Sequence, residues 1–146
     1  MFRLVFCSVA ALFVATLTLC AQTAEPRRPT SVRDGLYSAE QATRGRAAYE
    51  RACAECHMPD LAGHEYAGAL AGYGFQLKWQ DASVSELYGR IRSMPLGRPG
   101  WLTPQEYLDI LAYVLQKNGY PEGSSELTAA VAAQSRPRIP IERLTR

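Results

Sequence analysis

The stretch Cys53-Ala54-Glu55-Cys56-His57 is the most informative part of this sequence. Two thiols separated by two residues can each add to one vinyl group of a porphyrin, and the histidine directly after them can bind its iron. One helical turn brings both sulfurs and the imidazole to the same side of such a ring. The motif therefore predicts covalent haem attachment through Cys53 and Cys56, with His57 as an axial ligand.

The N-terminus has the pattern of a secretion signal. Arg3 supplies a positive start, residues 4–20 are mostly apolar, and small residues follow. We expect a signal peptide over residues 1–21, with cleavage after Ala21 or Ala24. An uncleaved membrane anchor is the alternative, since the apolar stretch is near the lower length limit of a spanning helix. A lipid anchor on Cys20 is less favoured, because the preceding leucine is bulky. Each interpretation places the domain in the periplasm.

Length, charge and cysteine content limit the number of domains, the kinds of partner and the disulfides that this chain can have. The chain has 146 residues, which suits one domain, and a net charge of +2, which gives no reason to expect nucleic-acid binding. Two of its four cysteines, Cys7 and Cys20, lie in the apolar N-terminal stretch. If that stretch is removed, only the motif pair remains, and no thiols are left for a structural disulfide framework.

Helix signals recur along the rest of the chain, and we find no convincing strand. Residues 22–37 are polar with two prolines and predict a flexible lead-in. Three helix starts follow, each with a capping residue and a Glu or Gln three positions later: Ser38 with Gln41, Ser83 with Glu86, and Thr103 with Glu106. The first helix runs into Cys53, and the last ends at Asn118-Gly119 before Pro121. The sequence predicts an all-α domain.

The segments between these helices carry turn residues. We expect loops over residues 58–82 and 95–102, because glycines and prolines interrupt any periodicity there. The C-terminal extension, residues 123–146, ends in a basic, proline-broken run and is expected to be partly disordered. The alternative is that the basic tail docks on a partner or on an acidic membrane surface.

A haem iron that only passes electrons needs a sixth ligand, and Met58, Met94 and His64 are the candidates. Met58 is adjacent to His57 and cannot reach the opposite face of the ring. His64 is only seven residues after His57, which is a short span for reaching the other side of the ring. Met94 is 37 residues after His57, at the end of a helix, and Pro95 and a turn-rich loop that could fold over the ring follow it. A methionine on an apolar helical face is usually core. We favour Met94 as the sixth ligand, with His64 or an open position as alternatives.

Residues around the iron ligands also matter. The outer ring nitrogen of His57 needs an acceptor, and we expect a backbone carbonyl within residues 66–70 to supply it. Aromatic side chains could line the ring or bond its propionates, although plain core packing explains them equally well; these are Tyr73, Trp79, Tyr88 and Trp101.

Together these residues resemble the class I cytochrome c family, in its small bacterial periplasmic branch, over roughly residues 40–122. Gly45 and Tyr49 match the family's glycine and aromatic residue that cross the C-terminal helix, where Ile110 and Tyr113 match the partner positions. The match continues through the haem motif and Met94-Pro95. The runs 107–115 and 118–121 are similar to cytochrome domains that serve periplasmic dehydrogenases.

The resemblance implies a small cytochrome c fold, with about three to five helices around one covalently bound haem c. The cytochrome domain would span residues 38–122, with Cys53 and Cys56 as anchors and His57 and Met94 as axial ligands. It would carry single electrons from a periplasmic dehydrogenase to an oxidase or another cytochrome of the respiratory chain. Gly68 stands where the family often has a proline whose carbonyl holds the histidine, so that part of the backbone is looser here.

Two other functions compete with electron transfer. A haem catalyst or gas-binding protein would keep an open or labile sixth position and bind carbon monoxide rapidly. A thiol–disulfide oxidoreductase would use the two thiols directly, but such proteins place the motif after a strand, and none precedes Cys53. Because a six-coordinate iron offers no open site, we expect no enzymatic activity from the chain by itself. Contact with the membrane, through an uncleaved signal or through the basic tail, is an alternative that the sequence allows.

Overall fold

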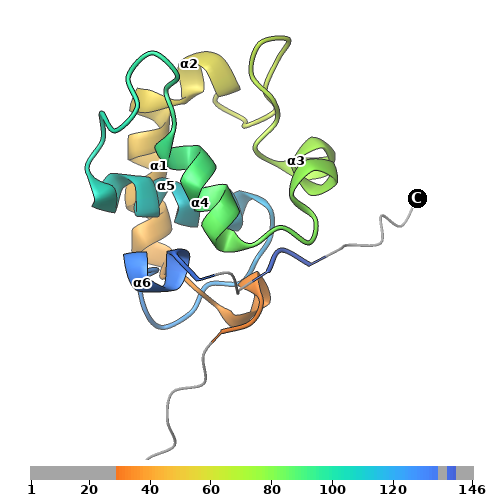
Figure 1. The fold of residues 1–146 in the computed structure, drawn as a ribbon, viewed down its shortest axis with the longest axis vertical. Helices are drawn as coiled ribbons and strands as arrows, with labels where there is room; N and C mark the ends of the chain where they lie inside the picture. Colours follow the sequence, from red (N-terminus) through yellow and green to blue (C-terminus); the bar gives the residue numbers. More distant parts are fainter. Residues whose placement is uncertain (1–28, 135–137, 141–146) are drawn as a thin grey trace, which may run out of the picture.

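The structure is a computed structural model that describes residues 29–134 and 138–140. Within these residues the chain forms helices joined by loops and no strand, apart from isolated bridges (Figure 1). The all-α prediction is confirmed. The elements, in chain order, are a 3₁₀ turn Val32–Asp34, α1 Ala39–Ala52, α2 Ala54–His57, α3 Gly72–Trp79, α4 Val84–Arg92, α5 Pro104–Lys117 and α6 Ala129–Ala132.

The most extensive contact in the domain is between α1 and α5. Gly45 makes this contact possible, because a Cβ atom at that position would collide with the backbone carbonyl of Asp109. One turn further on, the ring of Tyr49 packs on that of Tyr113, with centroids 5.5 Å apart. The expected crossing is therefore present, and the backbone at Asp109 is its point of closest approach.

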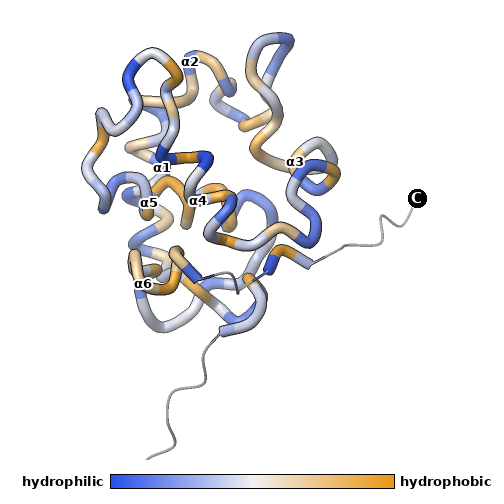
Figure 2. Tube along the Cα trace, in the orientation of Figure 1, coloured by the Kyte–Doolittle hydropathy of each residue, from blue (hydrophilic) through white to orange (hydrophobic). Residues whose placement is uncertain are grey.

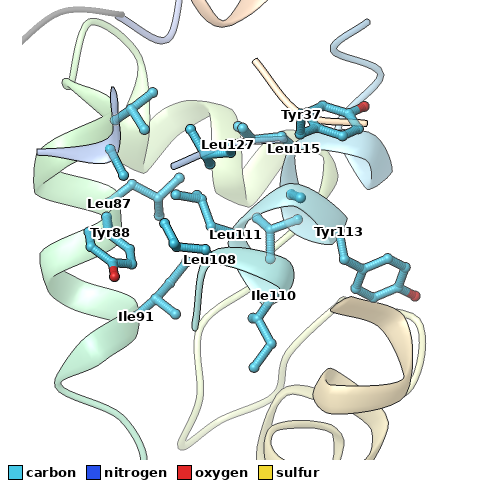
Figure 3. Close-up of a cluster of buried hydrophobic side chains, with 14 of the residues drawn as sticks. Tyr37, Leu87, Tyr88, Ile91, Leu108, Ile110, Leu111, Tyr113, Leu115 and Leu127 are labelled. Atoms are coloured by element: carbon cyan, nitrogen blue, oxygen red, sulfur yellow. The ribbon is translucent and has the colours of Figure 1, made fainter. Parts of the chain in front are cut away.

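Helix α5 is the centre of the hydrophobic core. Every residue from Tyr107 to Leu115 is buried, so the helix is covered by neighbours on all sides. Figure 3 shows side chains of α4 and α5 packed together, with Leu127 from the C-terminal segment and Tyr37 from the N-terminal one beside them. Along α4, hydrophobic and hydrophilic residues are mixed (Figure 2), and the buried ones recur every three or four positions, as expected for a helix with one buried face.

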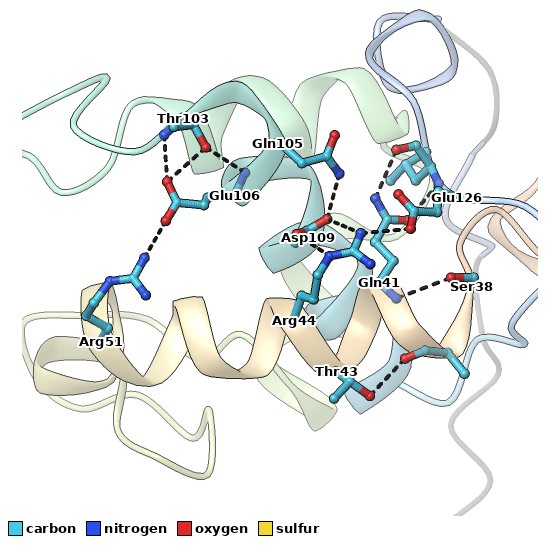
Figure 4. A network of polar contacts seen from close by, with 12 residues as sticks. Ser38, Gln41, Thr43, Arg44, Arg51, Thr103, Gln105, Glu106, Asp109 and Glu126 are labelled. Atoms are coloured by element: carbon cyan, nitrogen blue, oxygen red, sulfur yellow. Dashed lines mark hydrogen bonds and ion pairs between the residues drawn. The ribbon is translucent and has the colours of Figure 1, made fainter.

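A polar network joins α1 to α5 beside this core (Figure 4). The carboxylate of Asp109 is buried, and Arg44 binds it through Nε and Nη2 at 3.0 and 3.2 Å. The same guanidinium also contacts Glu126, and Gln105 donates to Asp109. Because each oxygen of the buried carboxylate accepts at least one hydrogen bond, the charge is tolerated inside the domain.

Two of the three expected capping boxes are complete. Ser83 with Glu86 and Thr103 with Glu106 exchange both hydrogen bonds. At the start of α1 only half of the box forms, because the Ser38 hydroxyl accepts from Gln41 N but the Gln41 side chain turns elsewhere. Its carboxamide bonds both backbone groups of Leu127, at 3.0 and 2.7 Å. Gln41 is thus a buried anchor for the C-terminal segment.

The loop expected over residues 58–82 contains a helix, α3, and that part of the prediction was wrong. Phe75 is fully buried, whereas Leu77 is about half exposed. The apolar residues of α3 are spaced by two, and Gly72 and Gly74 lie among them, so the segment has no helical periodicity. Packing of Phe75 and Trp79 into the domain gives this helix its buried side.

Both ends of the described chain pack on the domain. In the part of the lead-in that the structure describes, the Tyr37 hydroxyl donates to the carbonyl of Tyr120 at 2.6 Å. In the C-terminal extension, Ile139 is completely buried, and its backbone pairs with Asp81 and Ala82. The backbone of Arg138 pairs with Thr30 and Val32. Packing therefore extends beyond residues 38–122 on both sides.

The expected signal peptide, Cys7 and Cys20 lie outside the described residues, as does the tail beyond residue 140. No helix within the described residues has the length and apolar character that a membrane span requires.

Candidate haem-binding site

A cavity of about 380 Å³ opens between α2, the loop that follows it, and helices α3, α4 and α5. Cys53, Cys56 and His57 line one part of its wall, and Met94 also contributes to the wall. Most of the other lining residues are apolar, among them Leu70, Leu87, Ile91, Leu102, Ile110 and Val114. The four residues singled out from the sequence therefore meet at a single site.

The motif is presented by a break between two helices. Helix α1 ends at Ala52, and Cys53 leaves helical geometry with φ −127° and ψ −31°. Its N–H still bonds the carbonyl of Tyr49 at 2.8 Å, and its carbonyl accepts from His57 N at 2.9 Å. The short helix α2 then carries Cys56 and His57. This turn places all three side chains in the cavity wall.

The two thiols differ in environment. Cys56 is exposed, whereas Cys53 is half-buried. Burial, with the neighbouring Cys56 charge as a smaller cause, raises the pKa of the free Cys53 thiol to about 11. Both are free in the structure. Cys53 would thus be a neutral, poorly nucleophilic thiol in the folded chain, which is unlike the low-pKa cysteine of a thiol–disulfide oxidoreductase.

The imidazole of His57 is held by the loop that follows it in the chain. Its Nδ1 lies 2.8 Å from the carbonyl oxygen of Gly68, so the acceptor expected within residues 66–70 is confirmed. A carbonyl can only accept, so Nδ1 carries the proton and Nε2 has the free lone pair that a metal requires. Gly68 takes the place of the family's proline without loss of this hydrogen bond.

Met94 lies just beyond the end of α4. It is half-buried, and its N–H bonds the carbonyl of Ile91 at 3.0 Å. Its own carbonyl accepts a hydrogen bond from the Tyr107 hydroxyl at 2.9 Å. The residue is thus attached to the two helices that form the wall around it, α4 and α5.

The two competing ligand candidates do not line the cavity. Met58 is 40% exposed, and its carbonyl accepts from the Tyr49 hydroxyl. His64 lies in the loop, where its Nδ1 accepts from Tyr66 N at 3.1 Å and its ring packs against that of Tyr66. Among the described residues that line the cavity, Met94 is therefore the only methionine that could bind a haem iron held there.

Of the four aromatic residues named from the sequence, only Trp79 lines the cavity. It is buried, and its Nε1 has no hydrogen-bond partner among the described residues. A buried donor of this kind normally has an acceptor. Lys78 and Arg90 also lie at the cavity wall. A bound group with an apolar ring and acidic substituents would fill the cavity and supply that acceptor, so the residues present fit a haem.

Two tyrosines that line the cavity were not identified from the sequence as site residues. Tyr66 is 86% exposed, and Tyr107 is buried on the first turns of α5. Nothing in the local pattern distinguishes Tyr107 from an ordinary core residue, because it occupies an apolar position of the helix.

Comparison with known families decides the assignment. The model of the family described as cytochrome C oxidase, cbb3-type, subunit III matches residues 40–114, just over half of the chain. The chain belongs to this family. It is a class I c-type cytochrome, a haem-binding domain of the kind that transfers electrons. The match spans the cytochrome's motif, Met94 and most of α5. Neither curated proteins nor solved structures gave a match to the cytochrome.

Proposed function

We propose that this cytochrome is a periplasmic carrier of single electrons with one covalently attached haem c. The observation that carries the proposal is the meeting of Cys53, Cys56, His57 and Met94 around one apolar cavity. The cysteines would anchor the haem as thioethers, and His57 and Met94 would be its axial ligands. When bound, the haem supplies one-electron chemistry through its ferrous and ferric states.

The chain's own residues orient and shield that group. The Gly68 carbonyl fixes the His57 tautomer and makes the imidazole a more basic ligand. Apolar side chains from α4 and α5 would surround the ring, and this burial is one of the controls on the reduction potential of a haem iron. At the wall formed by α3 and α4, Trp79 would donate its indole N–H to a propionate, and Lys78 and Arg90 would balance the propionate charge.

The cellular setting rests on the sequence. The N-terminal pattern supports export to the periplasm, and the single motif supports one haem. The resemblance to cytochrome domains that serve dehydrogenases supports a periplasmic dehydrogenase as donor and an oxidase or another cytochrome as acceptor. With both axial positions filled by protein, the chain would have no catalytic activity of its own, although it could be a subunit of a dehydrogenase complex.

Spectroscopy of the purified protein tests the proposal. Expressed with a cytochrome maturation system, the parent should contain one haem per chain by the pyridine assay, and the haem should stay on the chain under denaturing conditions. Its oxidised spectrum should contain a thioether-to-iron charge-transfer band. Met94→Ala should lose that band, whereas the matched variant Met58→Ala should keep it.

The same samples distinguish the main alternative. A colourless parent would refute haem binding altogether. A parent without the band, whose reduced form binds carbon monoxide rapidly at neutral pH, would have an open or labile sixth position and would be a gas-binding or catalytic haem protein instead.

A further inference from the structure

The loop of residues 94–102, which connects α4 to α5 and begins with Met94, is weakly attached to the domain. Residues 96–101 are exposed, and Leu96 is 73% exposed. Most of the loop's contacts are internal: Arg98 N bonds the carbonyl of Pro95 at 2.8 Å, and the Arg98 guanidinium lies over the Trp101 ring. Internal turns of this kind do not fix the loop relative to α5.

One side chain of α5 contacts both ends of this loop. The Tyr107 hydroxyl donates to the Met94 carbonyl at 2.9 Å, and it accepts a longer hydrogen bond of 3.5 Å from Leu102 N. Within the described residues, these are the hydrogen bonds that tie the loop to α5. The Tyr107 ring itself is 3% exposed, so the hydroxyl is presented from a fixed, packed side chain.

The start of α5, from which Tyr107 projects, is itself fixed relative to the haem motif. Thr103 caps the helix and bonds Glu106. The Glu106 carboxylate also pairs with Arg51, near the end of α1 and two residues before Cys53 (Figure 4). The hydroxyl of Tyr107 therefore connects the Met94 backbone to the same framework that carries the two cysteines.

We infer that Tyr107 is a positioning residue that holds Met94 in place and so controls how readily its sulfur leaves the iron. The inference rests on the proposed function, in which Met94 is the sixth ligand. A phenylalanine at this position would fill the same volume but release the Met94 carbonyl. The loop could then move outward at lower cost, although the α1–α5 core would be unchanged.

Displacement of the Met94 sulfur by imidazole tests this role in the oxidised holoprotein. Loss of the thioether-to-iron band reports the displacement directly. Tyr107→Phe should bind imidazole about two- to tenfold more tightly than the parent, which is the range expected for the loss of one net hydrogen bond. In urea, the band of Tyr107→Phe should disappear at a lower concentration than its helical circular dichroism, whereas the parent should lose both closer together.

Tyr113→Phe is the matched control. It removes a hydroxyl from the same helix, and that hydroxyl makes no hydrogen bond among the described residues. Its imidazole affinity should equal that of the parent. Equal affinities for parent and Tyr107→Phe, or equal shifts in both tyrosine variants, would overturn the inference and leave the proposed function intact. Absence of the band from the parent would overturn both, so the two failures are distinguishable.

Discussion

The segment after His57 and the loop that starts at Met94 are held in different ways. Residues 58–72 bury Leu61 completely and are cross-linked by backbone bonds, among them Leu70 N to Leu61 O and the pair between His64 and Ala67. The loop of residues 94–102 buries Leu102 at its end and exposes its middle, and its hydrogen bonds to α5 among the described residues all go to the Tyr107 hydroxyl.

This difference predicts unequal local stability on the two sides of the cavity. Regions with few buried contacts and few anchoring hydrogen bonds open at lower free energy than the global unfolding transition. The His57 side should therefore stay in place while the Met94 side opens first. In a carrier of electrons, such an arrangement would keep the imidazole orientation constant and leave the thioether bond as the adjustable one.

The largest expected effect is on the stability of the whole domain, and it comes from a change at the α1–α5 contact that supports both sides of the cavity. Gly45→Ala places a methyl group against the Asp109 carbonyl, so α1 and α5 must separate. We expect the free energy of unfolding to fall by about 2–4 kcal/mol, measured by urea denaturation. As a control, Gly89→Ala lies in α4 with nothing near its Cβ and should raise stability by about 0.5–1 kcal/mol. An unchanged free energy of unfolding in Gly45→Ala would show that α1 and α5 do not approach this closely at Gly45.

A smaller change should affect the His57 side alone. The Asn118 carboxamide donates to the carbonyls of Leu70 and Val114 and accepts from Gly72 N, so it attaches the end of the His57 segment to α5. Asn118→Ala should lower the free energy of unfolding by about 1–3 kcal/mol, because these backbone groups lose their partner. The looser segment should also weaken the Gly68 hydrogen bond to His57 and raise the reduction potential.

The control for this variant is Gln116→Ala, an exposed change on the same helix that should leave both quantities unchanged. Imidazole affinity should also be unaltered in Asn118→Ala. If the imidazole affinity of Asn118→Ala increased as much as that of Tyr107→Phe, the two sides of the cavity would be coupled and would not open independently.

The smallest effect should come from the ion pair that joins the start of α5 to the end of α1, and it should depend on pH. Hydrogen bonds from the backbone and hydroxyl of Thr103, with the Arg51 charge as a further cause, lower the pKa of Glu106 from its ordinary value of 4.5. A carboxylate with a lowered pKa in the folded state stabilises the fold above the unfolded-state pKa, and that contribution disappears as the pH falls through the folded-state pKa.

Glu106→Gln should therefore be less stable than the parent by about 0.3–1 kcal/mol at pH 7, a range typical of partly exposed ion pairs. The difference should shrink as the pH falls below about 4.5, as measured by thermal unfolding over a pH series. As a control, Glu50→Gln breaks only the exposed Arg46 pair within α1 and should lower thermal stability less than Glu106→Gln does. A difference for Glu106→Gln that stayed constant down to acid pH would argue against a charge effect.

Much of this domain could be read from local signals in the sequence. Capping residues and helical periodicity located α1, α4 and α5, because these helices have one clear buried face or a strong start signal. A metal-binding imidazole needs an acceptor, and the carbonyl found within residues 66–70 agrees with the family resemblance, in which the loop after the motif supplies it.

The features that were missed depend on contacts between distant parts of the chain. The role of Tyr107 depends on where its hydroxyl lies relative to Met94, and helical spacing carries no such information. Gln41 matched a local capping pattern, but its carboxamide bonds Leu127 instead, because that buried backbone requires partners. Helix α3 is stabilised by burial of Phe75 and Trp79 in the domain, in spite of its glycines.

The pairing of Arg138 with Thr30 has a consequence for how this domain can be joined to others. It brings the two ends of the described chain side by side, at the end of the molecule away from α2 and the cysteines (Figure 1). A linker that joined residue 29 to residue 140 would therefore close the described chain into a circular permutant at this end of the molecule, away from the cysteines.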